Sequence, residues 1–346
     1  MGSISPEEPP KPWVETPCVL SAPLSRAAGC NIYLKLENLQ PSGSFKSRGI
    51  GNLMFQSISR SSIPSSHPER FHFYCSSGGN AGLAAATSAI ALGSPATIVV
   101  PTSCSAYMIG KLKSLGAEVV QIGANWGEAD AYLREELMAK ADGKEKGVYV
   151  PPFDHPDIWA GAASLVDELA VQMRGVRVDG VVCNVGGGGL MCGIVEGLKR
   201  WDADGKRPKV LAVETVGADA LYKSVEAGEL IKLPAITSIA TSLGAPMVAR
   251  KAFEDVMESK GEVVCATVTD GEAVRGSVQF LEDSRMLVEV ACGATMVTAY
   301  NGYLRKYLGK DMDDKEWKEQ NIVLVVCGGS NINLDLLNKY RETYGV

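Results

Sequence analysis

Lys46 follows the turn Ser42-Gly43-Ser44, with Phe45 between them, and begins an expected helix. The strand expected before this turn, over 31–37, has apolar residues at alternating positions. A lysine amine that is partly shielded from water at such a junction can bind an aldehyde as an imine. A lysine at a helix start can equally be a solvated side chain, so the loops further along the chain decide between the two interpretations.

The run Gly186-Gly187-Gly188-Gly189 follows a strand expected over 180–184 and precedes a helix expected to end near Lys199. Four glycines let several backbone N–H groups converge on one anion at a helix N-terminus. A dinucleotide fingerprint is excluded because Met191 and Cys192 stand where its third glycine belongs, and no Gly-Lys-Ser/Thr follows as in a Walker loop. The run therefore predicts a site for one phosphomonoester.

Two further loops follow expected strands. The run Ser76-Ser77-Gly78-Gly79-Asn80-Ala81-Gly82 suits either a bound carboxylate or capping of a helix expected over 81–92, and both interpretations stay open. The run Val326-Cys327-Gly328-Gly329-Ser330-Asn331 ends the last strand, where Cys327 either meets a ring nitrogen of a ligand or belongs to the core. Glu214 ends a strand over 209–214 and is either a capping carboxylate or a cation ligand.

Strands and helices alternate along most of the chain, which predicts an α/β protein with two doubly wound parallel-sheet lobes. One block has strands over 71–75, 96–100, 118–122 and 148–150 and a helix over 128–141, and the second has strands over 180–184, 209–214 and 322–327. We expect a large domain over 1–54 and 154–346 and a smaller, mobile domain over 55–153. Lobes of this type bind their ligand at the carboxyl ends of the strands.

Composition excludes several classes of protein. The chain has 346 residues and a net charge of -6 without a basic cluster, which argues against nucleic-acid binding. No apolar run approaches the ~20 residues of a membrane helix, and the N-terminus lacks a secretory core, so we expect a cytoplasmic protein. The three histidines do not have the spacing of a zinc site, and the nine cysteines read as reduced. Demanding chemistry would then need an organic cofactor.

Together these loops resemble those of the fold-type II pyridoxal-phosphate enzymes, which share the fold of the tryptophan synthase β-subunit. More closely, the chain is similar to the serine/threonine dehydratases (ammonia-lyases) of the eukaryotic L-serine dehydratase type. The resemblance runs from about Thr16 to the C-terminus, and five stretches carry it: Pro41-Ser42-Gly43-Ser44-Phe45-Lys46, Ser76 to Gly82, Pro151-Pro152-Phe153-Asp154, Val185 to Leu190, and Val326 to Asn331.

The resemblance implies a role for each candidate residue. Lys46 holds pyridoxal 5'-phosphate as a Schiff base and removes the substrate α-proton. Around the ring, Phe45 and Ser242 lie on its two faces, Asn80 bonds its 3-oxygen and Cys327 faces its nitrogen. The other implied ligands are Gly186, Gly187, Gly188, Gly189 and Leu190 for the phosphate, and Ser77, Gly78, Gly79, Asn80 and Ala81 for the substrate carboxylate.

The resemblance also implies the reaction, an α,β-elimination from L-serine, with L-threonine as a further substrate, to a 2-oxo acid and ammonia. A thiol at the ring nitrogen makes the ring a weaker electron sink than a carboxylate would, which suits elimination rather than transamination. A monovalent cation such as K+ would bind Glu214 and the carbonyls of Ala218, Leu243 and Ala245. A homodimer is expected, and the C-terminal regulatory module of biosynthetic threonine dehydratases is not.

Four residues depart from the family pattern. Ala162 stands where histidine is usual, Thr241-Ser242 replaces a Lys-Ala pair, and Val290 stands where proline is usual. These departures leave the substrate open, so a β-replacement synthase, a racemase or a dehydratase of a specialised β-hydroxy amino acid are alternatives. A pyridoxal-phosphate-binding protein without catalysis is the alternative outside enzymes, and the retained Lys46 argues against it.

Overall fold

The computed structural model describes residues 10–63, 67–139, 145–201 and 207–346. These residues form two compact units. Unit 1 comprises the described residues up to Val14 together with Gln40–Gly161, and unit 2 comprises Glu15–Leu39 and Ala162–Val346. The smaller domain expected over 55–153 falls within unit 1, and its boundaries as a domain that moves on ligand binding stay a prediction.

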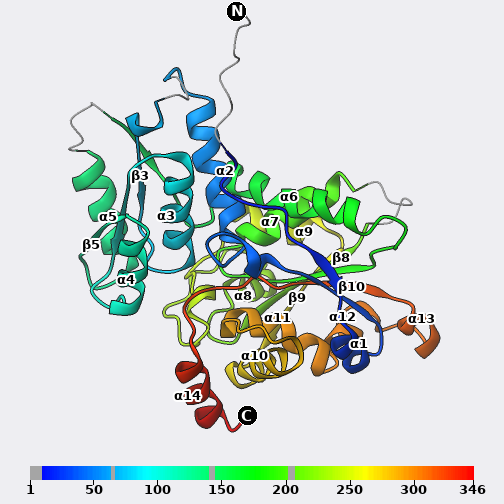
Figure 1. Ribbon diagram of the computed structural model, residues 1–346. Helices are drawn as coiled ribbons and strands as arrows, with labels where there is room; N and C mark the ends of the chain where they lie inside the picture. The colour runs from blue at the N-terminus through cyan, green and yellow to red at the C-terminus, as the bar shows by residue number, and fades with distance from the viewer. Residues whose placement is uncertain (1–9, 64–66, 140–144, 202–206) are drawn as a thin grey trace, which may run out of the picture. The chain divides into compact units, whose positions relative to one another are not determined.

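Unit 1 is built on a four-stranded parallel sheet, seen edge-on in Figure 1. Its strand order is β5-β4-β3-β6, with β3 at Phe71–Cys75, β4 at Ala96–Val100, β5 at Glu118–Gln121 and β6 at Lys146–Tyr149. The exact agreement of β3 and β4 with the expected ranges follows from their apolar runs, which are bounded by polar, glycine and proline residues.

Successive side chains of these strands point to opposite faces, and each face has its own helices. Phe71, Phe73 and Cys75 pack in a core with α2 (Lys46–Ser59), α3 (Asn80–Leu92) and α4 (Ala106–Ser114). Tyr74 and Val99 point the other way and pack with α5 (Trp126–Tyr132) and the following π-helix η3 (Leu133–Met138). Helices on both faces make unit 1 doubly wound, as expected.

Unit 2 contains a six-stranded sheet in the order β1-β2-β10-β7-β8-β9. The strands are β1 (Cys18–Leu20), β2 (Asn31–Lys35), β7 (Gly180–Asn184), β8 (Lys209–Thr215), β9 (Val263–Val268) and β10 (Asn321–Val325). All neighbours pair in parallel except β1, which pairs antiparallel with β2 at the edge. The carboxyl ends of β7, β8 and β10 therefore share one edge of the sheet.

Helices cover both faces of this sheet (Figure 1). The helix α7 (Gly189–Lys199) packs on β7 and α9 (Arg250–Glu258) packs on β9, whereas α11 (Val290–Tyr300) packs on β7, β8 and β10. The remaining elements are α1 (Ala22–Ala28), α6 (Pro156–Gln172), α8 (Ala220–Ala227), α10 (Asp270–Ser284), α12 (Tyr303–Leu308), α13 (Asp314–Lys318), α14 (Leu334–Tyr344), and the short helices η1 (Glu37–Leu39), η2 (Pro68–Arg70) and η4 (Thr241–Leu243).

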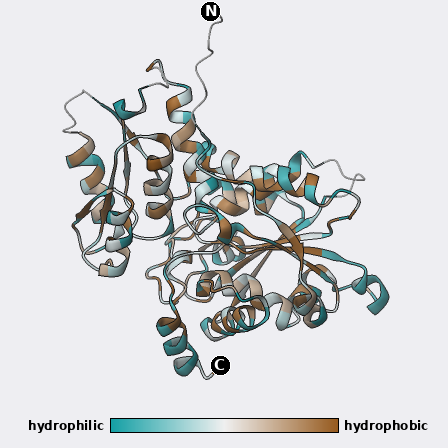
Figure 2. Cartoon of the chain, in the orientation of Figure 1, coloured by the Kyte–Doolittle hydropathy of each residue, from teal (hydrophilic) through white to brown (hydrophobic). Residues whose placement is uncertain are grey.

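Hydropathy follows these layers. In Figure 2 the strands of unit 2 form the hydrophobic layer, and the outer faces of the helices are hydrophilic. The central strands β7 and β8 are buried almost throughout, as parallel strands covered on both faces must be. Within the described part of the chain, no helix combines the length and the apolar composition needed to cross a bilayer.

Three elements differ from the sequence expectation. The edge strand β1 and the strand β9 were not expected, and β1 adds an antiparallel pair to a sheet predicted as parallel. The helix expected over 128–141 is α5 followed by the π-helix η3, and its expected end lies outside the described residues. The strand β1 is only three residues long, and its Val19 and Leu20 are exposed, so its sequence has no alternation of buried and exposed residues by which a strand could be predicted.

Candidate functional site

Lys46 is the first residue of α2 and is half-buried. Its Nζ donates a hydrogen bond to the Pro152 carbonyl at 2.5 Å and lies 5.3 Å from the centre of the Phe45 ring. The preceding turn is fixed by Ser47, whose Oγ accepts from the Ser42 N–H at 3.1 Å and donates to the Ser42 Oγ at 2.8 Å. The local fold therefore presents this amine at a defined position beside an aromatic face.

The loop expected to bind a carboxylate connects β3 to α3 in unit 1. Gly79 is the N-cap of α3 and Asn80 its first residue, and Ser77 Oγ accepts a hydrogen bond from the Gly79 N–H at 3.3 Å, so the choice between capping and carboxylate binding stays open. A Cβ on Gly82 would lie 1.8 Å from the Ser77 carbonyl oxygen, so only glycine lets the loop fold back on the helix. The loop thus presents backbone N–H groups at a helix N-terminus, as a carboxylate requires.

The glycine run leads from β7 into α7 in unit 2, and its backbone approaches two other segments closely. Gly188 has φ +93° and is the N-cap of α7, and a Cβ there would lie 2.5 Å from the Ala252 Cβ. A Cβ on Gly186 would lie 3.0 Å from the Ser242 carbonyl oxygen. Side chains are therefore excluded from a helix N-terminus whose N–H groups and dipole favour a phosphate.

Cys327 is buried two residues after the end of β10, and its sulfur accepts a hydrogen bond from Asn184 Nδ2 at 3.0 Å. The same amide donates to the Ala291 carbonyl at 2.7 Å. The neighbouring Cys292 thiol and burial hold the pKa of the Cys327 thiol well above its ordinary value. Cys327 is therefore a neutral thiol near neutral pH, which is the form that the predicted role at a ring nitrogen requires.

Ser242 lies in η4 and is exposed. Its hydroxyl donates a short hydrogen bond to Glu289 Oε2. Glu289 is 4% exposed and also accepts from the Asn331 backbone N–H at 2.7 Å. The buried carboxylate of Glu289 is thus hydrogen-bonded to Ser242, the residue predicted to face the cofactor ring.

Glu214 accepts hydrogen bonds from the backbone N–H groups of Leu221 (3.0 Å) and Tyr222 (2.7 Å) at the start of α8. Burial raises the pKa of its carboxyl to about 8, although both donors act to lower it. The residues predicted to offer carbonyls lie on two segments: Ala218, which follows β8, and Leu243 and Ala245, which lie in and after η4. Glu214 is therefore a capping carboxylate in this structure, and a cation role for it stays a prediction.

The candidate residues fall into two groups. Phe45, Lys46, Ser77, Gly78, Gly79, Asn80 and Ala81 belong to unit 1, whereas Gly186, Gly187, Gly188, Gly189, Leu190, Glu214, Ala218, Ser242, Leu243, Ala245 and Cys327 belong to unit 2. The roles that the resemblance implies for both groups stay predictions.

Sequence reasoning missed Asn184 and Glu289. Asn184 is the last residue of β7, so the rule that polar residues at strand carboxyl ends form sites identifies it. Glu289 gives no comparable signal, because an acidic residue directly before an apolar helix is usually an exposed N-terminal residue. Its burial depends on segments 40 residues and more away in the sequence.

Two of the departures have a structural setting. Val290 is the first residue of α11, a position where proline is favoured but not required, so valine fits there without strain. Ala162 is 2% exposed within α6.

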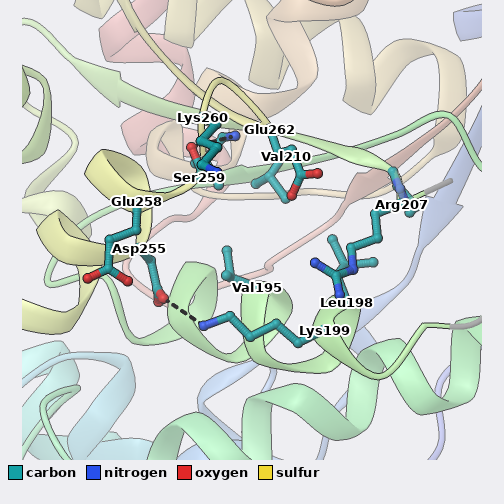
Figure 3. Close-up of a pocket in the computed structure, with 12 residues that line it drawn as sticks. Val195, Leu198, Lys199, Arg207, Val210, Asp255, Glu258, Ser259, Lys260 and Glu262 are labelled. Carbon is teal, nitrogen blue, oxygen red and sulfur yellow. Dashed lines mark hydrogen bonds and ion pairs between the residues drawn. The ribbon is translucent and has the colours of Figure 1, made fainter.

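Figure 3 shows a pocket of about 360 Å³ in unit 2, and none of the candidate residues lines it. It is lined by Val210 and Val263 at the amino ends of β8 and β9, and by Lys199 at the end of α7, where Lys199 Nζ pairs with Asp255 Oδ1 at 3.2 Å. The glycine run lies at the opposite end of α7. This pocket is therefore distinct from the predicted phosphate site.

Comparison with known proteins finds relatives along nearly the whole chain. A human protein named serine dehydratase-like is 44% identical over 332 residues, covering 96% of this chain and 95% of the human protein. The bovine L-serine dehydratase/L-threonine deaminase is 40% identical over 333 residues, 96% of each chain. The crystal structure of a fungal L-serine ammonia-lyase from Rhizomucor miehei matches with a TM-score of 0.83 and 35% identity, covering 96% of this chain and 99% of that one.

A family model described as pyridoxal-phosphate dependent enzyme matches residues 11–328. Two features of unit 2 suit that cofactor. The N-terminus of α7 consists of glycines, which leaves its N–H groups accessible to a phosphate, and Cys327 offers a neutral buried thiol to a ring nitrogen. The match covers both units and includes Lys46, the glycine run and Cys327. The chain belongs to the pyridoxal-phosphate dependent enzyme family, and its fold is that of the fold-type II members.

Proposed function

We propose that this enzyme is an ammonia-lyase that converts L-serine to pyruvate and ammonia, and L-threonine to 2-oxobutyrate and ammonia. The observation that carries the proposal is the similarity, over 96% of the chain, to a protein named L-serine dehydratase/L-threonine deaminase. The reaction removes the α-proton and the β-hydroxyl as water, and hydrolysis of the released enamine takes water up again, so serine gives one pyruvate and one ammonia.

When bound, pyridoxal phosphate supplies an electron-withdrawing ring that stabilises negative charge at the substrate α-carbon. In this proposal Lys46 would hold the cofactor covalently through its aldehyde, and its amine is the base that would take the substrate α-proton. The Pro152 carbonyl accepts a hydrogen bond from Nζ and so orients this amine. Phe45 offers an aromatic surface beside it.

The other residues bind and orient. The loop from Ser77 to Ala81 holds the substrate carboxylate through its N–H groups, and the glycine run holds the cofactor phosphate at the start of α7. Cys327 is held by Asn184 and keeps its proton, so it neutralises no positive charge at the ring nitrogen. That arrangement favours elimination over reactions that require a protonated ring.

A panel of amino acids tests the substrate. We expect L-serine and L-threonine to yield the 2-oxo acid and ammonia in equal amounts, measured by lactate dehydrogenase coupling and glutamate dehydrogenase coupling, and D-serine to yield neither. Absence of both products at millimolar L-serine would refute the proposal. Loss of optical rotation without ammonia would identify a racemase, and a persistent absorbance change without ammonia would identify a β-replacement synthase.

We further propose that a monovalent cation, K+, binds Glu214 and the carbonyls of Ala218, Leu243 and Ala245. The support is the buried carboxyl, which carries a full charge only at a high desolvation cost unless a cation compensates it. Across the described residues, no group of three or more His, Cys, Asp or Glu side chains gathers as a metal site, so carbonyls would supply the other ligands.

The K+ proposal predicts that replacing K+ by tetramethylammonium at constant ionic strength lowers the Tm of the wild type by roughly 5 °C, because a ligand at 100 times its Kd stabilises the folded state by about 2.7 kcal/mol. The Glu214→Gln variant should show no difference between the two salts. Equal responses of wild type and variant in differential scanning calorimetry would contradict the cation site.

We also propose that the enzyme is a cytoplasmic homodimer. The support is the edge strand β1 of unit 2, where Val19 is 41% and Leu20 is 57% exposed, because an exposed edge strand can pair with a second chain. Light scattering should give twice the 36.7 kDa of one chain, and subcellular fractionation tests the location.

A further inference from the structure

Glu289 is held by its backbone on a rigid pair of helices. It is the N-cap residue of α11, and its carbonyl accepts a hydrogen bond from Ser277 Oγ of α10 at 3.2 Å. The two helices touch backbone to backbone, because a Cβ on Gly293 would lie 2.1 Å from the Ala273 carbonyl oxygen. The stem of the Glu289 side chain therefore begins from a fixed point.

The carboxylate of Glu289 does not serve its own helix. An N-cap side chain ordinarily accepts from the first N–H groups of its helix, and this one makes no such bond. It reaches two loops instead, accepting from the Asn331 N–H at Oε1 (2.7 Å) and from the Ser242 hydroxyl at Oε2. Asn331 Nδ2 in turn lies 3.4 Å from Ser242 Oγ, which closes a ring of three residues.

The backbone after β10 is shaped around this carboxylate. Gly328 and Gly329 have φ +81° and +117°, and a Cβ on Gly329 would lie 2.3 Å from Glu289 Cδ. Residues other than glycine are strained at such angles, and a side chain at position 329 would also overlap the carboxylate. The two glycines thus let the chain pass directly over Glu289, from Cys327 to Asn331.

We propose that Glu289 is a positioning residue for the cofactor, whose carboxylate ties the segment 241–243 to the segment 328–331. This inference rests on the proposed function, in which Ser242 and Cys327 lie at the cofactor ring. It assigns the Ser242 hydroxyl proton to Glu289 and not to the ring or the substrate. The serine that replaces the usual alanine thereby becomes part of the tie.

Two substitutions of Glu289 by side chains of similar length test, in the protein without cofactor, whether the carboxylate ties the two segments together. Glu289→Met removes both acceptor oxygens, and hydrogen exchange followed by mass spectrometry should show exchange of the Asn331 amide accelerated by roughly tenfold or more. Glu289→Gln retains one carbonyl oxygen for this N–H and should keep the amide protected. Unchanged Asn331 exchange in Glu289→Met would overturn the proposal.

Titration of the same proteins with pyridoxal 5'-phosphate alone gives the second measurement. We expect the Kd for the cofactor to rise roughly tenfold in Glu289→Met. Ser242→Ala should raise this Kd when Glu289 is present, but should not raise it further in the Glu289→Met variant. Additive effects would overturn the tie. Should Glu289→Met not fold, Ser242→Ala alone must leave Asn331 protected, because its acceptor Oε1 remains. No amino acid enters these measurements, so a wrong substrate assignment would leave their outcome unaffected.

Discussion

The Lys46→Ala variant is expected to lose covalently bound cofactor and to form pyruvate from L-serine at least about 10⁴-fold more slowly than the wild type, because one residue supplies both the attachment and the proton transfer. Borohydride reduction followed by peptide mass spectrometry should find the cofactor on Lys46 in the wild type and no adduct in the variant. An adduct on another lysine, or turnover within tenfold of wild type, would refute the assignment.

The same substitution should leave the fold intact. Lys46 begins α2, where a positive charge opposes the helix dipole, and alanine is the better helix former there. The hydrogen bond from Nζ to the Pro152 carbonyl is lost, which costs on the order of 1 kcal/mol. Lys113→Ala, at an exposed position in α4, is the matched control and should change neither the adduct nor turnover.

Local sequence signals were sufficient for the parts of the fold that depend on local pattern. The strands over 71–75, 96–100 and 180–184 are apolar runs with sharp ends, and the structure has them at those residues. The strand β9 was missed although it is Val-rich, because one of its faces is only half-buried and its neighbours read as helices. The π-helix η3 has the composition of an ordinary helix, so no local signal separates it from α5.

The candidate site divides in the same way. Gly188 and Gly82 are identifiable from sequence because a glycine run at a strand-to-helix junction has a direct physical meaning. Glu289 was not identifiable, because its burial and its partners Ser242 and Asn331 depend on how α10, α11 and two loops pack. Residues that position others through long-range contacts leave no periodic pattern in the sequence.

The Gly188→Ala variant should bind pyridoxal 5'-phosphate roughly 100-fold more weakly, since the positive φ and the overlap with Ala252 each cost about 1–3 kcal/mol and displace the N-terminus of α7. Cofactor fluorescence during titration of the cofactor-free protein measures this Kd. The fold should survive, because the substitution changes one loop and leaves the strands on either side unaltered.

A control and a rescue separate the two causes. Gly228 ends α8 at φ +73° with nothing within 4 Å of its would-be Cβ, so Gly228→Ala carries the backbone strain without the overlap and should leave the Kd unchanged. Adding Ala252→Gly to Gly188→Ala removes the overlapping methyl and should recover about tenfold of the affinity. If Gly188→Ala binds the cofactor as tightly as the wild type, the glycine run does not hold the phosphate and the predicted site at the start of α7 is wrong.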